Sequence, residues 1–123
     1  MNVSKFEELE VYQLSERLSD KIWKIVDEWE FLPKKTVGIQ LINSSDSIGA
    51  NLAEGYGRES LADRSRFAKI SRGSLFETKH WIVKAFKRKL ISDVDFEELQ
   101  EVLDILLPKL SAYINYLNRR VKN

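Results

Sequence analysis

The strongest constraint on the fold of this chain is an apolar repeat in its C-terminal third. Seven residues there occupy a and d positions over three heptads: Phe96, Leu99, Leu103, Leu106, Leu110, Tyr113 and Leu117. A helix with such a seam is stable only when other helices cover it. We therefore predict a helix from about Asp93 to Val121, capped by Ser92, as one member of a bundle. Pro108 lies inside this helix, and we expect a kink there because the repeat continues in register beyond it.

Three earlier segments repeat apolar residues at the same helical period. They run from about Leu9 to Trp29, from Lys34 to Tyr56 and from Ser60 to Lys89. Pro33 suits the first turn of the second of these helices, and Ser60 has the position of an N-cap for the third. Four helices with short connections predict an all-α protein with one domain over residues 1–123. The predicted architecture is an antiparallel, up-down-up-down four-helix bundle.

The second and third predicted helices each have a distinct apolar pattern. The main stripe of the second consists of Val37, Leu41, Ile48 and Leu52, with Ser44 and Ser45 on the same side. A second strip on the opposite side consists of Ile39, Ile42, Ala50 and Ala53. A helix with two apolar sides is buried on both or lies in a contact between subunits. The predicted core side of the third helix consists of Phe67, Ile70, Ser74, Trp81 and Ala85, flanked by Leu75 and Ile82.

Composition excludes several classes of protein. The chain contains no cysteine, which excludes a disulfide framework, a thiolate zinc site and a catalytic thiol, and fits a reducing, cytoplasmic setting. Apolar residues at 43% and charged residues at 32% indicate a globular domain. No apolar run approaches the roughly 20 residues that span a bilayer. The first residues, MNVSKFEELE, do not resemble a signal peptide, and Ser4 with Glu7 has the spacing of a capping box.

Two glycines interrupt the helical pattern in the stretch NLAEGYGRES, residues 51–60. A phosphate-binding loop would place glycines ahead of a helix, but this stretch lacks a preceding strand and the spacing of nucleotide-binding motifs. We interpret the stretch as the corner between two helices. Gly55 and Gly57 are predicted to end the second helix in the left-handed conformation that glycine adopts readily.

Polar side chains at this corner are predicted to form a structural clasp of Asn51, Glu54 and Arg58. Asn51 and Glu54 lie one turn apart, and a buried carboxylate needs a cationic partner such as Arg58 or an arginine of the third helix. No nucleophile or second acid accompanies Glu54, which disfavours general acid–base chemistry.

One pair of residues has the spacing of metal ligands, Glu77-x-x-His80. Di-iron bundles need this motif on two helices, with further carboxylates from the other two, and His80 is the only histidine in the chain. We therefore interpret His80 as a surface residue. We expect no metal, no cofactor and no enzymatic activity.

Positive charge is concentrated in the third predicted helix. The net charge of the chain is +1, but residues 58–89 contain 10 Lys or Arg and 3 Asp or Glu, whereas residues 1–31 contain 4 and 8. At about 100° per residue, the cations line or flank one face that also includes Phe76 and Val83. The residues predicted to bind nucleic acid there are Arg64, Arg66, Lys69, Arg72, Lys79 and Lys87.

The residues alone leave three interpretations of this cationic face open. Cations at this density can contact phosphates, and the interleaved apolar residues can stack on a base. The face can instead be solvated and paired with acids of the first and fourth helices, which are both acidic. It can also bind an acidic protein partner.

Much of the chain resembles one known family. The segments that carry the resemblance are FEELEVYQLSERLSDKIW, QLINSSDSIGANLAEGYGRES and RFAKISRGSLFETKHWI. They resemble bacterial four-helix-bundle proteins encoded within intervening sequences of 23S ribosomal RNA genes. This broad family also includes relatives of the accessory variability protein of diversity-generating retroelements. The resemblance extends from Phe6 to about Leu117 and includes Gln40, Ser47, Asn51, Glu54, Gly55, Arg58, Phe67, Ser74 and Glu77.

The resemblance implies a bundle that is commonly assembled as a homopentamer around a central channel, with no established enzyme activity. The retroelement relatives are positively charged and assist a reverse transcriptase by binding the enzyme and nucleic acid. Family members often carry two arginines two and three positions after the glutamine, where this chain has Ile42 and Asn43. Any contact made by those arginines is therefore absent, whereas the third helix keeps its basic residues.

These observations lead to two hypotheses about function. The first is a non-catalytic, homo-oligomeric, cytoplasmic protein that binds RNA or DNA through the third helix, including a role as accessory to a reverse transcriptase. The alternative is a structural protein–protein interaction module with no nucleic-acid role.

Overall fold

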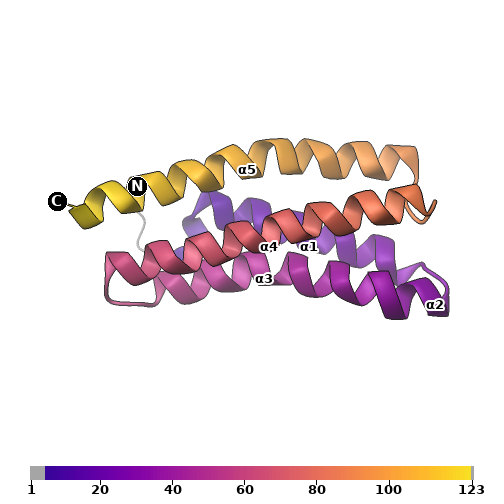
Figure 1. The fold of residues 1–123 in the computed structure, drawn as a ribbon, viewed down its shortest axis with the longest axis horizontal. Helices are drawn as coiled ribbons and strands as arrows, with labels where there is room; N and C mark the ends of the chain where they lie inside the picture. Colours follow the sequence, from indigo (N-terminus) through magenta and orange to yellow (C-terminus); the bar gives the residue numbers. More distant parts are fainter. Residues whose placement is uncertain (1–4, 123) are drawn as a thin grey trace.

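Seven helical segments build residues 5–122, the part of the chain that this computed structural model describes (Figure 1). The four long helices are α1 (Glu10–Asp27), α3 (Ile39–Tyr56), α4 (Leu61–Lys87) and α5 (Asp93–Lys122). The three short segments are the 3-10 turn η1 (Phe6–Glu8), α2 (Phe31–Pro33) and the π-helical turn η2 (Lys34–Gly38). Ser4 of the predicted capping box lies outside the described residues.

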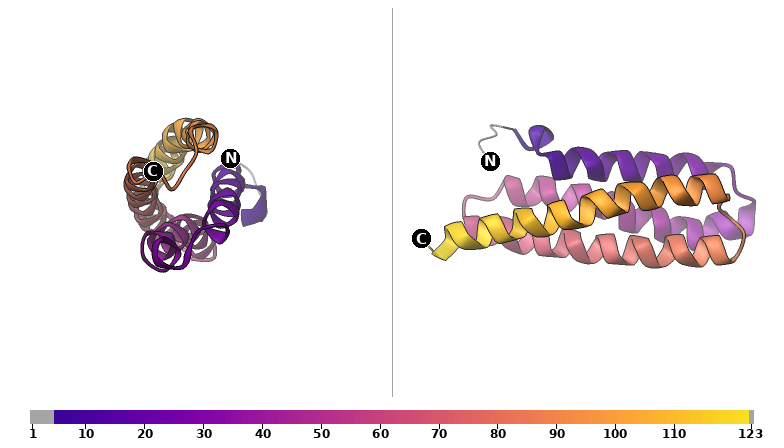
Figure 2. Two further views of the ribbon diagram at one scale, coloured as in Figure 1. Left: turned by 90° about the vertical axis from the view of Figure 1, so that its right-hand side faces the viewer. Right: turned by 90° about the horizontal axis from the view of Figure 1, so that it is seen from above.

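The long helices lie side by side as a bundle (Figures 1 and 2). Each packs against the next long helix of the chain, and α5 also packs against α1, so the contacts form a closed ring. Successive long helices run in opposite directions, as expected when short turns join them (Figure 1). The predicted all-α four-helix bundle is confirmed. None of the helices within residues 5–122 combines the length and apolar character needed to cross a bilayer.

The second long helix has an extended N-terminal end. The chain passes through α2 and η2 into α3 on one helical path, so helical structure begins at Phe31 rather than at the predicted Lys34. Pro33 lies in the first turn as predicted, where an N–H has no helical acceptor. A Cβ on Gly38 would lie 2.7 Å from Cγ1 of Val26, so this glycine lets η2 pass close to α1.

The core between the helices is made by the predicted apolar repeats. Leu99, Leu106 and Leu110 of α5 have no exposed surface, and α5 continues through Pro108 as one helix with a visible curve (Figure 1). The main stripe of α3 is buried as well: Val37, Leu41, Ile48 and Leu52. Burial of each such side chain is worth about 1.5–3 kcal/mol, so these two stripes supply much of the stability of the fold.

The buried side of α4 is rotated relative to the predicted one. Phe67 and Ala85 are buried as predicted, but Ile70 is 43% exposed, so its assignment to the core is wrong. Ser74 and Trp81 are half-buried. The buried side is centred instead on Ser71, Leu75, Thr78 and Ile82. Half of these residues are polar, and hydroxyl side chains do not contribute to an apolar pattern.

Hydroxyl groups join α4 to α3 where the two helices meet. Ser71 Oγ donates to the carbonyl of Ile48 at 2.7 Å, and Thr78 Oγ1 donates to Ser44 Oγ at 3.1 Å. Because these buried hydroxyls are hydrogen-bonded, they avoid the cost of desolvation without a partner. Their small size also allows the two helices to approach closely.

The stretch of residues 51–60 forms the α3–α4 corner, as predicted, but its glycines do not act as predicted. Gly55 lies inside α3, and Gly57 has φ −76° at the C-cap. No described glycine has a positive φ, so the prediction of a left-handed ending is wrong. A Cβ on Gly55 would lie 2.7 Å from Cβ of Phe67, so Gly55 is required for the close approach of α4.

A left-handed residue occurs instead at the C-terminal end of α4. Lys89 has φ 62°, the only positive φ among the described residues. The N–H of Leu90 donates to the carbonyl of Ala85 at 2.9 Å, which is the six-to-one bond of a Schellman motif, where glycine is the usual residue. Ser92 then caps α5 as predicted, accepting a hydrogen bond from the N–H of Asp95 at 3.1 Å.

Candidate nucleic-acid interface

One side of α4 presents cations to solvent along most of the helix. Residues three and four apart share a side of a helix, so the cations gather on the side that faces away from α3 and α5. Arg72 and Lys84 are half-buried, and the other cations of this side are exposed. We define the basic face as Arg66, Lys69, Arg72, Lys79, Lys84, Lys87 and Arg88.

The basic face is not neutralised by acids of the same chain. Within residues 5–122, Arg66 is its only member with an ion pair, to Asp63 at 3.5 Å on the previous turn. The ion pairs between α1 and α5 use Lys21 and Lys109 instead. This arrangement disfavours the interpretation in which acids of the first and fourth helices pair with the basic face.

The C-terminal half of the basic face borders an open groove of about 540 Å³. Phe76, with 53% of its surface exposed, lies among the cations that line this groove. The remaining lining residues are Lys79, His80, Val83, Lys84, Lys87 and Arg88. Cations around an exposed ring combine groups that bind phosphate with a surface on which a base can stack.

Two of the six residues predicted to bind nucleic acid are drawn into the fold. Arg64 turns toward the α3–α4 corner, where Nη2 donates to the Tyr56 carbonyl at 3.1 Å and the guanidinium lies 4.3 Å from the centroid of the Tyr56 ring. Arg72 is half-buried, with Nη1 3.5 Å from Ser111 Oγ of α5. Arg64 therefore packs at the corner and is half-buried there. The four predicted residues that are exposed are Arg66, Lys69, Lys79 and Lys87.

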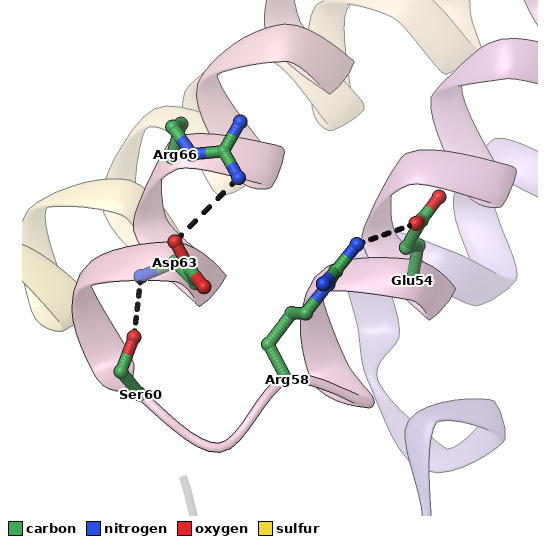
Figure 3. A network of polar contacts seen from close by, with 5 residues as sticks. All are labelled: Glu54, Arg58, Ser60, Asp63 and Arg66. Carbon is green, nitrogen blue, oxygen red and sulfur yellow. Dashed lines mark hydrogen bonds and ion pairs between the residues drawn. The ribbon is translucent and has the colours of Figure 1, made fainter.

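The predicted polar clasp at the corner joins two of its three residues (Figure 3). Arg58 Nη2 donates to Glu54 Oε1 at 2.9 Å, an exposed pair one helical turn apart. Asn51 Nδ2 donates instead to the carbonyl and the hydroxyl of Ser47, at 2.8 and 2.9 Å. Asn51 thus belongs to a hydrogen-bond network within α3. Glu54 thus has the cationic partner that was predicted for it, although the pair is exposed rather than buried.

The same corner orders the N-terminal end of the basic face. Ser60 caps α4 as predicted, because the N–H of Asp63 donates to Ser60 Oγ at 3.0 Å, and Asp63 also pairs with Arg66 (Figure 3). The guanidinium groups of Arg58 and Arg66 lie 5.0 and 4.7 Å from the centroid of the Phe67 ring. The guanidinium of Arg66 therefore contacts both a carboxylate and an aromatic ring. Lys69 has neither kind of contact within residues 5–122.

Glu77 and His80 are both exposed. Glu77 Oε2 accepts a hydrogen bond from Trp81 Nε1 at 3.2 Å, and the His80 ring lies with its centroid 4.8 Å from that of Trp81. No group of three or more His, Asp or Glu residues within residues 5–122 is arranged to hold a metal ion. The Glu77-x-x-His80 spacing thus lacks the further ligands that a di-iron bundle provides.

The sequence patterns did not predict an acidic cluster of Glu16, Asp20 and Asp46 between α1 and α3. Burial raises the pKa of Glu16 above its ordinary value near 4.5, and the charges of Asp20 and Asp46 raise it further. Burial also raises the pKa of Asp46, with a further contribution from Asp20. Gly49 makes room for Glu16, because a Cβ there would lie 2.5 Å from Glu16 Oε1. The only sequence signal was the i,i+4 spacing of Glu16 and Asp20, since Asp46 joins them through helix packing.

Large apolar side chains are exposed where α1 passes through α2 into α3. The exposed fractions are 58% for Trp23, 74% for Phe31, 70% for Leu32 and 44% for Ile39. Trp23 and Ile42 line a hollow of about 100 Å³ between α1 and α3. We call these five residues the apolar end. Ile39 and Ile42 belong to the second apolar strip predicted for this helix, so that strip lies at the surface of the single chain.

Comparison with known proteins agrees with this architecture. A crystal structure of a protein of unknown function from the S23 ribosomal protein family of Bacteroides thetaiotaomicron is similar, with a TM-score of 0.74 and 23% identity over 85% of this chain and 97% of that chain. No curated protein matches the chain. The family model for the 23S rRNA-intervening sequence protein matches residues 7–112. Because that match spans most of the sequence, this chain belongs to the 23S rRNA-intervening sequence protein family.

Proposed function

We propose that this protein is a non-catalytic homo-oligomer that binds RNA or DNA through the basic face of α4. The observation that carries this proposal is the missing counter-charge: six of the seven cations on the face have no acidic partner within residues 5–122. A nucleic-acid backbone supplies that counter-charge as a regular row of phosphates.

The length of the basic face suits a nucleic-acid strand. At about 1.5 Å per residue, the helix from Arg66 to Lys87 extends over roughly 30 Å. Each strand of a duplex carries one phosphate per about 3.4 Å of helix axis, so several phosphates lie within reach of this face. Binding through many phosphate contacts weakens steeply with salt, and we expect the logarithm of the affinity to fall linearly with the logarithm of the salt concentration.

Reversing two exposed charges tests the proposal. Lys69 and Lys79 have no hydrogen bond or ion pair within residues 5–122, so the double variant Lys69→Glu, Lys79→Glu is expected to keep its helical circular dichroism spectrum. Its affinity for a labelled RNA or DNA oligonucleotide at low salt is expected to fall at least about tenfold, because two contacts become repulsive. Fluorescence anisotropy measures this change.

A matched control distinguishes the effect of charges on the basic face from the effect of the net charge of the protein. Arg17 and Lys24 are exposed on α1, so Arg17→Glu with Lys24→Glu changes the net charge equally but leaves α4 intact. We expect this control to bind nearly as well as the wild type. An equal loss in both double variants would show that net charge, and not α4, determines binding, and an absence of binding by the wild type at low salt would overturn the proposal.

The apolar end supports the homo-oligomeric part of the proposal. Leu32 and Phe31 are the most exposed large apolar residues of the described chain, and covering them with a second copy removes them from water. The resemblance to the family implies five copies, so light scattering is expected to give five times the 14.4 kDa of one chain. Leu32→Glu should reduce this mass, whereas Ile105→Glu, at a residue of α5 with 45% exposure, should not. Equal masses for wild type and Leu32→Glu would exclude this contact.

The same exposed residues favour a second candidate function, a structural protein–protein interaction module with no nucleic-acid role. In that case the wild type forms the oligomer but binds neither RNA nor DNA at low salt. The resemblance to the retroelement relatives also implies a reverse transcriptase partner. Co-purification of a co-expressed reverse transcriptase that persists after nuclease treatment is the result expected for that partnership.

A further inference from the structure

Phe76 is exposed in the middle of the cations of the basic face. Its surface is 53% exposed, whereas that of the adjacent Leu75 is 2% exposed, so the core contact at this point of α4 is made by the leucine. Within residues 5–122, Phe76 takes part in no aromatic pair and no cation–π contact. A ring without a ring partner that lies in a groove with four cations is a platform on which a nucleic-acid base can stack.

Gly73 leaves the helix surface beside this ring bare. It lies three residues before Phe76 and four after Lys69, so the three residues share one side of α4. A Cβ on Gly73 would meet no heavy atom within 4 Å. Glycine inside a helix is unfavourable relative to alanine, and no intramolecular contact offsets that cost here. A bare position allows a ligand to approach the backbone of α4 more closely than any side chain would.

A second hollow, of about 110 Å³, extends from the ring into the contact between α4 and α5. Phe76 and Lys79 line both this hollow and the open groove. On the α5 side, Pro108 has no N–H, so the carbonyl of Asp104 lacks the donor that it would have in a regular helix. The hollow thus combines apolar residues with the acidic residue Asp104 and the cation of Lys79 beside the ring. These are the groups that recognise the face and the edge of an unpaired base.

The two forms of nucleic acid differ in what they offer to this arrangement. Cations alone bind single strands and duplexes through phosphates. A duplex keeps the faces of its bases stacked on one another, whereas a single strand offers them to an aromatic side chain. We infer that the basic face of α4 selects single-stranded over double-stranded nucleic acid by stacking an unpaired base on Phe76. This inference rests on the nucleic-acid binding proposed above.

The decisive experiment compares Phe76 variants on two ligands. The full chain is titrated against a labelled oligo(U) or oligo(dT) strand and against a duplex of the same length, at one salt concentration, with anisotropy as the readout. Phe76→Leu keeps an apolar side chain and the charge of the face but removes the ring. We expect it to lower the affinity for the single strand roughly 5- to 100-fold and to leave the affinity for the duplex unchanged. Phe76→Tyr keeps a ring and is expected to bind the single strand like the wild type.

A second variant tests the bare position beside the ring. Gly73→Gln adds bulk without charge, so it should weaken binding to the single strand even though the helix becomes thermally more stable. Ala62→Gln adds similar bulk on the same side of α4 near its N-terminal end, outside the groove, and should bind like the wild type.

The outcomes separate this inference from the proposed function. If the wild type binds neither ligand at low salt, the proposed function itself fails. If the wild type binds both ligands equally and Phe76→Leu behaves like the wild type on both, nucleic-acid binding stands and selection by stacking is overturned. If Phe76→Leu weakens only single-strand binding while Lys69→Glu with Lys79→Glu weakens both, both statements are supported.

Discussion

The inward and outward sides of α4 belong to one helix but meet different requirements. On the inward side, Leu75 and Ile82 are buried, and the hydroxyls of Ser71 and Thr78 have partners in α3. On the outward side, Phe76 is exposed and Gly73 contacts nothing. Packing within the chain therefore explains each residue of the inward side. No contact within the described chain explains the outward pair, and an exposed ring beside a helical glycine is the pattern expected of a surface that a partner covers.

Gly55 and Gly73 show the same difference between a position that packing explains and one that it does not. Gly55 of α3 faces Phe67 and the carbonyl of Arg64, at 2.7 and 3.3 Å from the position of a Cβ. Gly73 of α4 faces open space. One glycine is required by the fold, and the other is tolerated by it.

The largest expected effect is a difference in the free energy of unfolding between variants of two adjacent residues, Leu75 and Phe76. Leu75→Ala should lower the free energy of unfolding by about 2–5 kcal/mol, because it leaves a cavity in the core. Phe76→Ala should change that free energy by no more than about 0.5 kcal/mol, because more than half of the surface of Phe76 is already exposed. Urea unfolding followed by circular dichroism, at one protein concentration, measures both. A loss of similar size in Phe76→Ala would abolish the distinction between the two sides.

Gly55→Ala should destabilise the protein although alanine favours helix. The added methyl group would overlap Cβ of Phe67, and α3 and α4 must move apart, at a cost of about 1–3 kcal/mol. A lowered melting temperature in a thermal scan is the expected result. A stabilised Gly55→Ala variant would mean that the α3–α4 contact adjusts freely.

Gly73→Ala should have the opposite sign. Nothing lies within 4 Å of the added Cβ, so the gain in helix propensity, about 1 kcal/mol, is expected in full. The same thermal scan should therefore show a raised melting temperature. A destabilised Gly73→Ala variant would mean that another copy of the chain packs on the outward side, and dilution of the sample would then shift the transition.

The smallest expected effect concerns the acidic cluster of Glu16, Asp20 and Asp46 between α1 and α3. Its like charges lie close together, whereas the cations of the basic face are spread along α4. The pKa of Glu16 is raised in the folded state, so the folded protein holds its proton to higher pH than the unfolded chain does. The resulting stabilisation is present at low pH and is lost as the pH rises through the raised pKa of Glu16. At pH 7, Glu16→Gln should therefore raise the free energy of unfolding, by no more than about 0.5 kcal/mol.

The pH dependence provides the control for this variant. Below about pH 3, Glu16 is protonated in both states, and the difference between Glu16→Gln and the wild type should vanish. Melting temperatures measured across this pH range test the sign. A difference that grows toward low pH would contradict the assignment of the raised pKa of Glu16 to burial and to the neighbouring acidic charges.

Local patterns predicted many of the elements of this fold. The helix ends at Ser60 and Ser92, the first-turn Pro33 and the buried heptads of α5 depend on residues close together in sequence. The concentration of cations on α4 was also visible, because it depends only on helical geometry. The rotation of α4 was not visible, since Ser71 and Thr78 become core residues only through hydroxyl partners on α3.

Partner choice at the candidate interface likewise depended on distant groups. Arg64 and Lys69 look alike in the sequence, but the carbonyl of Tyr56 draws Arg64 into the corner. Asn51 is an exception, because it bonds to Ser47 only one turn earlier and Arg58 pairs with Glu54 over the same spacing. Gly55 looked like a helix terminator, but it serves the approach of Phe67, a residue of the next helix.

Local sequence patterns were enough to predict that four amphipathic helices form, that Ser60 and Ser92 cap two of them, and which helix carries the positive charge. They were enough because periodicity, capping and charge density act over one or two helical turns. The packing of the helices was needed to show which side of α4 is buried, which cations have no acidic partner within residues 5–122 and which glycine faces open space. These properties depend on groups from other helices, whose distances are set by packing and leave no signature along one segment of chain.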